Sequence, residues 1–423
     1  MSSATKRVLF VMHTVAIGGM ETLTVDVAGE FVRRGITVHA IVPENPDFNP
    51  LEERFRKAGA TVLRLSTDHL KSRAMQMQRL ARFVSFCKEI DPEVVHLHTG
   101  GTAGGFGVVS AARAFSDATL IYTEHDVTNA PPPTLTSFDS QSRHWVMRRM
   151  LDKLCHALMA VSRRNAAIRR KWLDPGADKF AAVLNGIPIR PFSDEERTRY
   201  RQEILKGFGI DPSETVIGTL CRLTPGKGLD DLVKAFAIAN GQSPCRLLLV
   251  GDGPLAHELA ELAKANGVGD RVHFAGYQAA PLPYLNAMDI FALAVPAGSM
   301  SIALLEAMAQ GLPCVITFCG PEEAVIGDKT GLCGPPKDPP GLAKTLLRLV
   351  ESAELRASIG AAAAEHIRAN FSIARVADDW LEIYETCRTT GIQARLRADS
   401  PVGARPEPLV NIRPKPESSA SPN

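Results

Sequence analysis

Short apolar runs alternate with amphipathic helical patterns along almost the whole chain. The apolar runs are continuous, which is typical of parallel strands buried on both faces. We expect strands at 8–12, 37–42, 61–65, 94–97, 119–123, 158–161 and 180–183, and a second set at 215–220, 246–250, 272–275, 290–293 and 313–317. Strands that alternate with helices form βαβ units, so the pattern predicts an α/β fold with two doubly wound parallel sheets.

The two sets of expected strands are separated by a polar, charged stretch near 189–212. A chain of 423 residues is also too long for one hydrophobic core. We therefore expect one Rossmann-like domain over 1–189 and another over 190–372. The end of the chain, 391–423, is rich in Pro, Arg and Ser and is expected to be a disordered tail.

The composition argues against several classes of protein. A net charge of +2 gives no electrostatic case for nucleic-acid binding. No apolar run approaches the roughly 20 residues that span a bilayer, and the first apolar stretch is too short and strand-like for a signal peptide. The 8 cysteines form no CxxC pair, and most lie in apolar segments. We therefore expect a cytoplasmic protein without disulfides or a zinc site.

A loop with two cations follows the expected strand at 215–220, in the stretch CRLTPGKGLDDLVKAF. A helical pattern begins directly after the loop. The start of a helix presents free backbone N–H groups, and Arg222 and Lys227 add two positive charges. The loop is therefore a candidate site for a diphosphate, and a solvated loop with two surface cations is the alternative.

Two further strand-to-helix loops contain glycine pairs. Gly18 and Gly19 follow the first strand, and Gly251 and Gly253 follow the strand at 246–250. Glycine lets a backbone approach a ligand closely, and a helix N-terminus favours an anion. The alternative for both loops is a tight turn that binds nothing.

Three histidines lie at or just past the ends of two expected strands: His96, His98 and His125. His125 is the better candidate for a polar or acid–base role, whereas packing or a hydrogen bond would explain the other two. No helical HExxH and no Cys partner supports zinc binding. Glu306 lies in an otherwise apolar helix and needs a partner, which would be ribose hydroxyls or a salt bridge.

The order of these motifs resembles that of the GT-B glycosyltransferases of family 4. The matching pieces, within about 6–388, are GGMETLTVDVA, TEHD, VSRRN, VLNGIP, CRLTPGKGLDDLVKAF, LLLVGDGP, LLEAMAQGLPCVIT and PEEAVIGDKTGLCGPP. The resemblance implies a retaining, nucleotide-sugar-dependent enzyme whose two Rossmann-like domains face a cleft. The first domain would be on the acceptor side, the second would bind the donor, and a last helix at 373–390 would cross back to the first.

The resemblance also implies roles for individual residues. Arg222 and Lys227 would bind the donor diphosphate, and Glu306 would hold the ribose. His125 would lie near the reacting sugar and, with Arg222 and Lys227, complete the catalytic set. The donor-binding positions that it implies are Gly18, Gly19, Arg222, Lys227, Gly251, Gly253, Ser301 and Glu306.

One position departs from the family's pattern. The first glutamate of the Glu-x7-Glu motif should stand where this chain has Gly298. In the family that glutamate contacts the donor sugar, so its absence puts sugar binding or full activity in doubt. A catalytically weakened partner subunit that binds a nucleotide sugar is therefore an alternative function. A nucleotide-sugar epimerase is a second one, but the motif order argues against it.

The expected donor is UDP- or GDP-linked, and no metal or other cofactor is expected because the chain has no Asp-x-Asp motif. Arg222, Lys227 and helix N-termini would instead stabilise the leaving diphosphate. The acceptor would be a polysaccharide or a lipid-linked glycan of the cell envelope. The basic segment 142–171 would allow peripheral contact with the inner face of the cell membrane, and a solvated helix face is its alternative.

Overall fold

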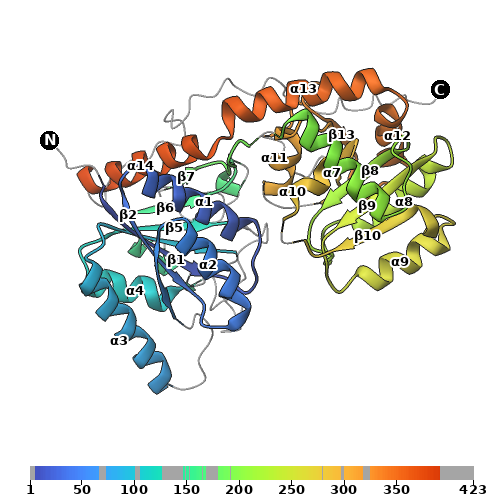
Figure 1. Cartoon of the computed structure of the whole chain (residues 1–423). Coiled ribbons are helices and arrows are strands. Elements are labelled where there is room, and N and C mark those ends of the chain that lie inside the picture. The colour runs from blue at the N-terminus through green and yellow to red at the C-terminus, as the bar shows by residue number, and fades with distance from the viewer. Residues whose placement is uncertain are drawn as a thin grey trace, which may run out of the picture.

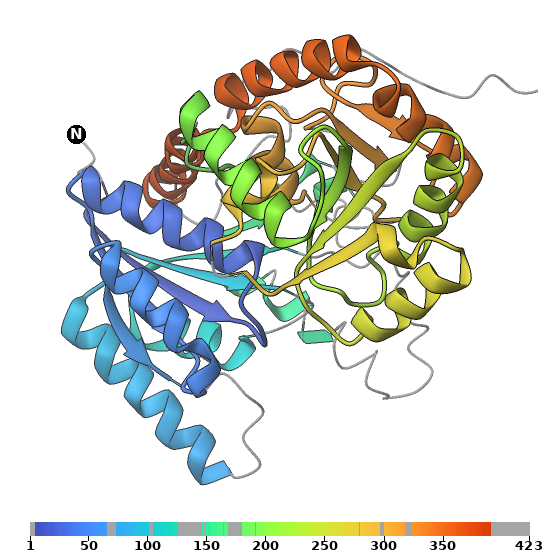
Figure 2. The same cartoon turned by 45° about the vertical axis from the view of Figure 1, so that its right-hand side comes forward.

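The computed structural model describes residues 5–65, 73–100, 105–125, 146–147, 149–151, 153–163, 165–167, 180–190, 192–278, 280–296, 300–317 and 324–390. Within these ranges the chain forms two parallel sheets with helices packed on them (Figure 1). Figure 2 shows the two sheets and their helices from a view turned by 45°. The expected fold class is confirmed.

The first half forms a 7-stranded parallel sheet of order β3-β2-β1-β4-β5-β6-β7. Successive residues of a strand point to opposite faces of the sheet, and both faces of these strands are apolar. Helices α1 and α2 therefore cover one face, and α3 and α4 cover the other. The elements are β1 (Arg7–His13), α1 (Gly19–Arg33), β2 (Thr37–Val42), η1 (Pro46–Phe48), α2 (Asn49–Lys57), β3 (Thr61–Arg64), α3 (Arg73–Ile90), β4 (Val94–Thr99), α4 (Phe106–Phe115), β5 (Thr119–Glu124), β6 (Ala157–Ala160) and β7 (Phe180–Ala182).

The second half forms a 6-stranded parallel sheet of order β10-β9-β8-β11-β12-β13. Its elements are α7 (Asp194–Gly207), β8 (Thr215–Leu220), α8 (Leu229–Asn240), β9 (Cys245–Val250), α9 (Ala256–Ala265), η2 (Gly269–Arg271), β10 (Val272–Gly276), α10 (Leu282–Leu285), β11 (Ile290–Leu293), α11 (Ile302–Ala309), β12 (Cys314–Thr317), β13 (Leu332–Gly334), α12 (Pro339–Val350) and α13 (Ala353–Asn370).

Every strand expected from the apolar runs is present, and one further strand, β13, was not expected. The expected domain boundary at 189 and 190 stays a prediction, although the first sheet ends at Ala182 and the second begins at Thr215. The polar stretch between the sheets forms helix α7, whose start is capped by the Ser193 hydroxyl accepting from the Glu196 backbone N–H.

The last described helix, α14 (Ile373–Thr390), returns to the first half and packs against α1 and β5. In Figures 1 and 2 it lies beside the N-terminal sheet, while α13 lies over the second half. Its Trp380 and Tyr384 are buried against Phe10 of β1 and Phe31 of α1. The crossover helix implied by the resemblance is therefore present, and it completes the core of the first half.

The chain passes between its two halves twice, and the two connecting segments lie side by side near Ile187 and Phe371. The backbone N–H of Ile187 donates to the carbonyl of Phe371, and the N–H of Ile373 donates to the carbonyl of Ile187, both at 2.9 Å. A Cβ on Gly186 would lie 2.5 Å from the Val376 side chain and 2.9 Å from the carbonyl oxygen of Phe371. Gly186 is thus required for the close approach of the two crossing segments.

No helix within the described ranges is both long and apolar enough to cross a membrane. The seven described cysteines form no disulfide with one another. The predicted disordered tail at 391–423 lies outside the described residues.

Candidate functional site

The loop after β8 carries the two predicted diphosphate ligands. Arg222 is exposed and Lys227 is half-buried. Both charges act on Cys221, because burial raises the pKa of its thiol whereas Lys227 and Arg222 lower it. The two cations therefore lie around the carboxyl end of β8, where ligands of doubly wound sheets bind. The predicted stripe of α8, which comprises Leu229, Leu232, Val233 and Phe236, is buried, and this fixes the helix start beside the loop.

The start of α1, in the first half of the chain, lies near the loop that carries Arg222 and Lys227. The backbone N–H of Gly18 donates to the Glu21 carboxylate at 2.7 Å, which is the half of a capping box that the N3 residue supplies. Glu21 is 2% exposed, and burial raises its pKa, while the nearby Thr14 hydroxyl, the hydrogen bond from Gly18 and the charge of Arg222 lower it. Since Arg222 acts on Glu21, Gly18 and Gly19 lie close to the cationic loop of the other half.

The start of α11 meets the start of α1. A Cβ on Gly19 would lie 3.1 Å from the Ile302 side chain, so the first residues of the two helices touch. Ser301 caps α11, with its hydroxyl accepting from the Leu304 backbone N–H at 3.3 Å. Two positive helix ends therefore point into one region beside Arg222. This convergence is a ready-made anion site.

The glycines after β9 have a structural task. Gly251 and Gly253 have φ values of +134° and +158°, and a Cβ on each would lie 1.9 Å from the Cys221 carbonyl oxygen and 2.4 Å from that of Leu223. The backbone of this loop thus packs directly on the cationic loop, and Asp252 accepts from the Leu223 N–H at 2.9 Å. The structure places both glycines beside the candidate site, and their contact with a base stays a prediction.

Glu306 lies one turn into α11 and is half-buried. Its pKa is raised to about 7, first by burial and then by the charge of Asp26, while the charge of Arg54 opposes this rise. Asp26 has a pKa raised to about 6 by burial, which Arg54 and Arg190 oppose. The Glu306 carboxylate has no hydrogen bond or ion pair to another residue within the described ranges. The salt-bridge alternative is therefore supported only by the nearby charge of Arg54, which forms no ion pair with Glu306. The ribose-binding role of Glu306 stays a prediction.

The three histidines form a buried group at the carboxyl ends of β4 and β5. His96 bonds through Nδ1 to the Tyr384 hydroxyl and through Nε2 to the Thr123 hydroxyl, both at 2.6 Å. His98 Nδ1 lies 3.2 Å from His125 Nε2. His125 is 7% exposed, and burial lowers its pKa to about 3. The expectation that His96 and His98 have hydrogen-bonding or packing roles is confirmed.

His125 lies at the same sheet edge as the Gly18 loop, because Thr99 pairs with both His13 at the end of β1 and Glu124 at the end of β5. Two strand spacings, or about 10 Å, separate the ends of β1 and β5. No three His, Cys, Asp or Glu side chains form a cluster that could hold a metal ion among the described residues. The absence of a metal requirement stays a prediction.

Sequence reasoning left Glu21, Asp26 and Arg54 out of the site. Glu21 carried a signal, since it stands at the capping-box position of α1. Asp26 and Arg54 carried none, because their charges reach Glu306 only through the contact between the two halves. Gly298 lies outside the described residues, as does much of the basic segment 142–171, within which β6 is a fully buried strand.

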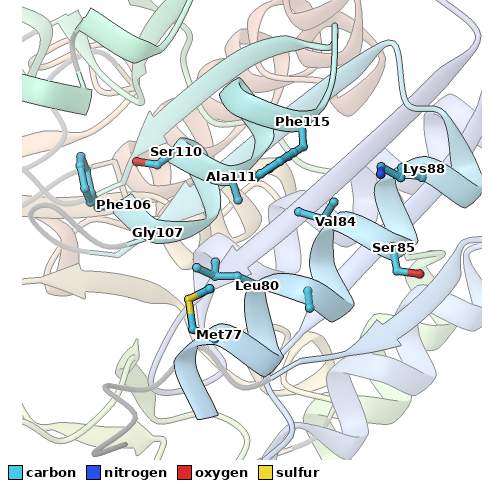
Figure 3. Close-up of a pocket in the computed structure, with 11 residues that line it drawn as sticks. Met77, Leu80, Val84, Ser85, Lys88, Phe106, Gly107, Ser110, Ala111 and Phe115 are labelled. Atoms are coloured by element: carbon cyan, nitrogen blue, oxygen red, sulfur yellow. The ribbon is translucent and has the colours of Figure 1, made fainter. Parts of the chain in front are cut away.

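The structure also has a cavity of about 650 Å³ in the first half of the chain. Figure 3 shows that α3 and α4 form its walls, with Met77, Leu80 and Val84 on α3 and Phe106 and Phe115 on α4. Its lining comes from these two helices alone. It is therefore separate from the region where α1, α8 and α11 begin.

Two family models match the two halves of the chain. Residues 17–190 match the model described as Glycosyltransferase Family 4, and residues 214–352 match that described as Glycosyl transferases group 1. Together the two ranges span well over half of the chain. They contain the starts of α1 and α8 and the whole of α11, which are the elements that form the candidate site.

Among characterised proteins, the chain is similar to the N-acetyl-alpha-D-glucosaminyl L-malate synthase of Bacillus anthracis. The two are 32% identical over 48% of this chain and 52% of that protein, so the match spans about half of the relative's length. The alpha-monoglucosyldiacylglycerol synthase of Acholeplasma laidlawii is 24% identical over 75% of this chain and 81% of its own.

The fold is that of solved glycosyltransferase-like structures. HepE of Anabaena, in complex with UDP and glucose, superimposes with a TM-score of 0.75 at 21% identity, over 90% of this chain and 100% of HepE. The motif order, the two Rossmann-like sheets with a returning helix, and the match of both halves to the two family models agree. The chain belongs to the GT-B glycosyltransferases of family 4.

Proposed function

We propose that this protein transfers a sugar from a UDP- or GDP-linked donor to a polysaccharide or lipid-linked acceptor of the cell envelope. The convergence of the α1 and α11 N-termini beside Arg222 and Lys227 carries the proposal. Fixed positive charge at this point suits a leaving nucleoside diphosphate, whose negative charge grows in the transition state. The cations and helix ends supply this stabilisation without a metal ion.

Stereochemistry and acceptor are part of the same proposal. Transfer proceeds with retention through a front-face displacement that the leaving phosphate assists, as the family resemblance implies. The Acholeplasma laidlawii relative is named for synthesis of a glycolipid, which supports a lipid-linked acceptor. We propose that the protein works in the cytoplasm, with peripheral contact to the inner face of the cell membrane.

The proposal is tested by incubating the full chain with a panel of UDP- and GDP-sugars and membrane extract. We expect release of one nucleoside diphosphate together with a glycosylated product that has the anomeric configuration of the donor. Turnover should persist in EDTA, because the charge on the diphosphate is met by Arg222 and Lys227. Binding of a nucleotide sugar without any product would favour the weakened partner subunit, and failure to bind any nucleotide would refute both functions.

A further inference from the structure

His98 lies at the centre of the buried histidine group. His98 is 0% exposed. The centroid of the His96 ring lies 4.0 Å from that of His98, with an angle of 36° between the ring planes. The Trp380 ring lies 5.1 Å away by the same measure, at an angle of 30°. The two tilted rings pack against the imidazole and restrict where its nitrogens can find partners.

Only one of those nitrogens has a partner in the described structure. Nδ1 of His98 lies 3.2 Å from Nε2 of His125, whereas Nε2 of His98 is enclosed and has no hydrogen-bond partner. A buried N–H without an acceptor costs about 1–3 kcal/mol, and orphaned buried donors are rarer than orphaned acceptors. The proton of neutral His98 therefore belongs on Nδ1, and the unpartnered Nε2 carries a lone pair.

This assignment determines the proton of His125. If His98 Nδ1 donates, His125 Nε2 accepts and is unprotonated, so a neutral His125 carries its proton on Nδ1. Burial of His125 keeps the ring neutral at physiological pH, since its pKa is lowered to about 3. Nδ1 is bonded to none of the residues that the structure describes.

We propose that His98 is a positioning residue that fixes the tautomer of His125, so that His125 meets the substrate as an Nδ1–H hydrogen-bond donor and not as a base. This inference rests on the proposed function, because it takes His125 as a residue near the reacting sugar. The substrate atom that faces His125 must then be an acceptor, namely a hydroxyl or phosphate oxygen of the nucleotide sugar.

The tautomer is measured on the ligand-free full chain with ¹⁵N-labelled histidine, from the long-range ¹H–¹⁵N couplings of the His125 ring. We expect protonated Nδ1 and unprotonated Nε2 in the wild type. A proton on Nε2 of His125 would overturn the proposal. Because this spectrum needs no substrate, it decides the tautomer even if the protein transfers no sugar, which would refute only the proposed function.

A variant pair tests the consequence for catalysis. His98→Phe keeps an aromatic ring between His96 and Trp380 but removes the donor, so His125 should gain the Nε2–H tautomer and kcat should fall about tenfold, the effect of losing roughly 1.4 kcal/mol. UDP affinity should stay within about twofold, since the diphosphate ligands are untouched. His98→Asn supplies an amide N–H close to the Nδ1 position and should restore both the tautomer and kcat.

The matched control is Thr123→Val, which removes the neighbouring hydrogen bond to His96 and leaves the pair of His98 and His125 intact. It should lower stability without moving the His125 proton. An unchanged His125 tautomer in His98→Phe, or an equal change in Thr123→Val, would refute the positioning role.

Discussion

The Glu21 carboxylate in the first turn of α1 lies within the field of the Arg222 guanidinium, which comes from the opposite half of the chain. Glu21 is held by the capping hydrogen bond from Gly18, and its Oε1 is enclosed without a partner in the described structure. One predicted diphosphate ligand is thus already attracted to a buried carboxylate. A bound diphosphate would compete with Glu21 for Arg222.

Replacing either cation should weaken nucleotide binding. Arg222→Ala and Lys227→Ala each remove a charge-assisted hydrogen bond, which typically costs about 1.5–3 kcal/mol, or roughly 10- to 150-fold in affinity. Calorimetry with UDP and GDP measures the change. Lys234→Ala is the matched control, because Lys234 pairs with Asp230 on the outside of α8. Unchanged affinity in both variants would refute the diphosphate site.

Removing the charge of Glu21 should act in the opposite direction. Glu21→Gln keeps an acceptor for the Gly18 N–H, since glutamine serves at this position, but it relieves the competition for Arg222. Because Arg222 is exposed, solvent screens its attraction to Glu21, and the gain is smaller than for a buried ion pair. We expect UDP to bind about three- to tenfold more tightly at low salt, and less so at high salt. Weaker binding would show that Glu21 supports the ligand directly.

Donor affinity should depend on pH through Glu306. If the carboxylate accepts from ribose hydroxyls it must be ionised, and its pKa is raised to about 7, first by burial and then by the charge of Asp26. Affinity for a nucleoside diphosphate sugar, whose phosphates do not titrate in this range, should rise from pH 6 to pH 8. Asp26→Asn should move the midpoint to lower pH, because it removes a like charge, and Glu306→Gln should abolish the dependence.

In the ligand-free protein, the raised pKa of Glu306 should make the free energy of unfolding fall as pH rises. A carboxyl whose pKa rises on folding from its ordinary value of 4.5 to about 7 binds more protons in the folded state. Its contribution to stability is therefore present below the unfolded pKa and is lost as pH rises through 7. Urea unfolding between pH 5 and pH 8 should show this loss in the wild type and a smaller one in Glu306→Gln. A rise in the wild-type stability attributable to Glu306 would contradict the burial argument.

Glycine at 251 should matter more than glycine at an open turn. Gly251→Ala forces a Cβ to within 1.9 Å of the Cys221 carbonyl oxygen at a φ of +134°. We expect a loss of at least about 3 kcal/mol in the free energy of unfolding and a displaced cationic loop. Gly267→Ala, at a φ of +72° with nothing within 4 Å, should cost about 1–2 kcal/mol for the backbone alone. Equal costs would show that the two loops do not pack as described.

A substitution at Gly298 distinguishes a donor site that has only lost sugar affinity from one that is specialised for a different donor sugar. If the missing glutamate only weakens sugar contacts, a nucleoside diphosphate still binds well, and Gly298→Glu should gain affinity for a common UDP- or GDP-hexose. A specialised site predicts that the wild type turns over a donor that the variant rejects. Equal binding and turnover of both proteins would show that position 298 does not face the donor.

The fold could be predicted because its signal is local. The buried parallel strands are continuous apolar runs, and the apolar residues at helical spacing in α1 (Leu23, Val27 and Phe31) and α8 are buried. Strand β13 was not predicted, because it has only three residues and directly follows Thr330 and Gly331, which do not extend an apolar run. The charge relations of Glu21 with Arg222 and of Glu306 with Asp26 could not be predicted, since each joins side chains from opposite halves of the chain.

The returning helix α14 has a consequence for the order of events during synthesis. Phe10 and Phe31 belong to the first elements made, whereas Trp380 and Tyr384, which complete their packing, belong to the last described helix. At typical translation rates, roughly 10–40 s separate the end of the first sheet from α14. Until then the nascent N-terminal half exposes an aromatic surface that only its own distant C-terminal segment covers, so a chaperone that shields this surface would favour productive folding.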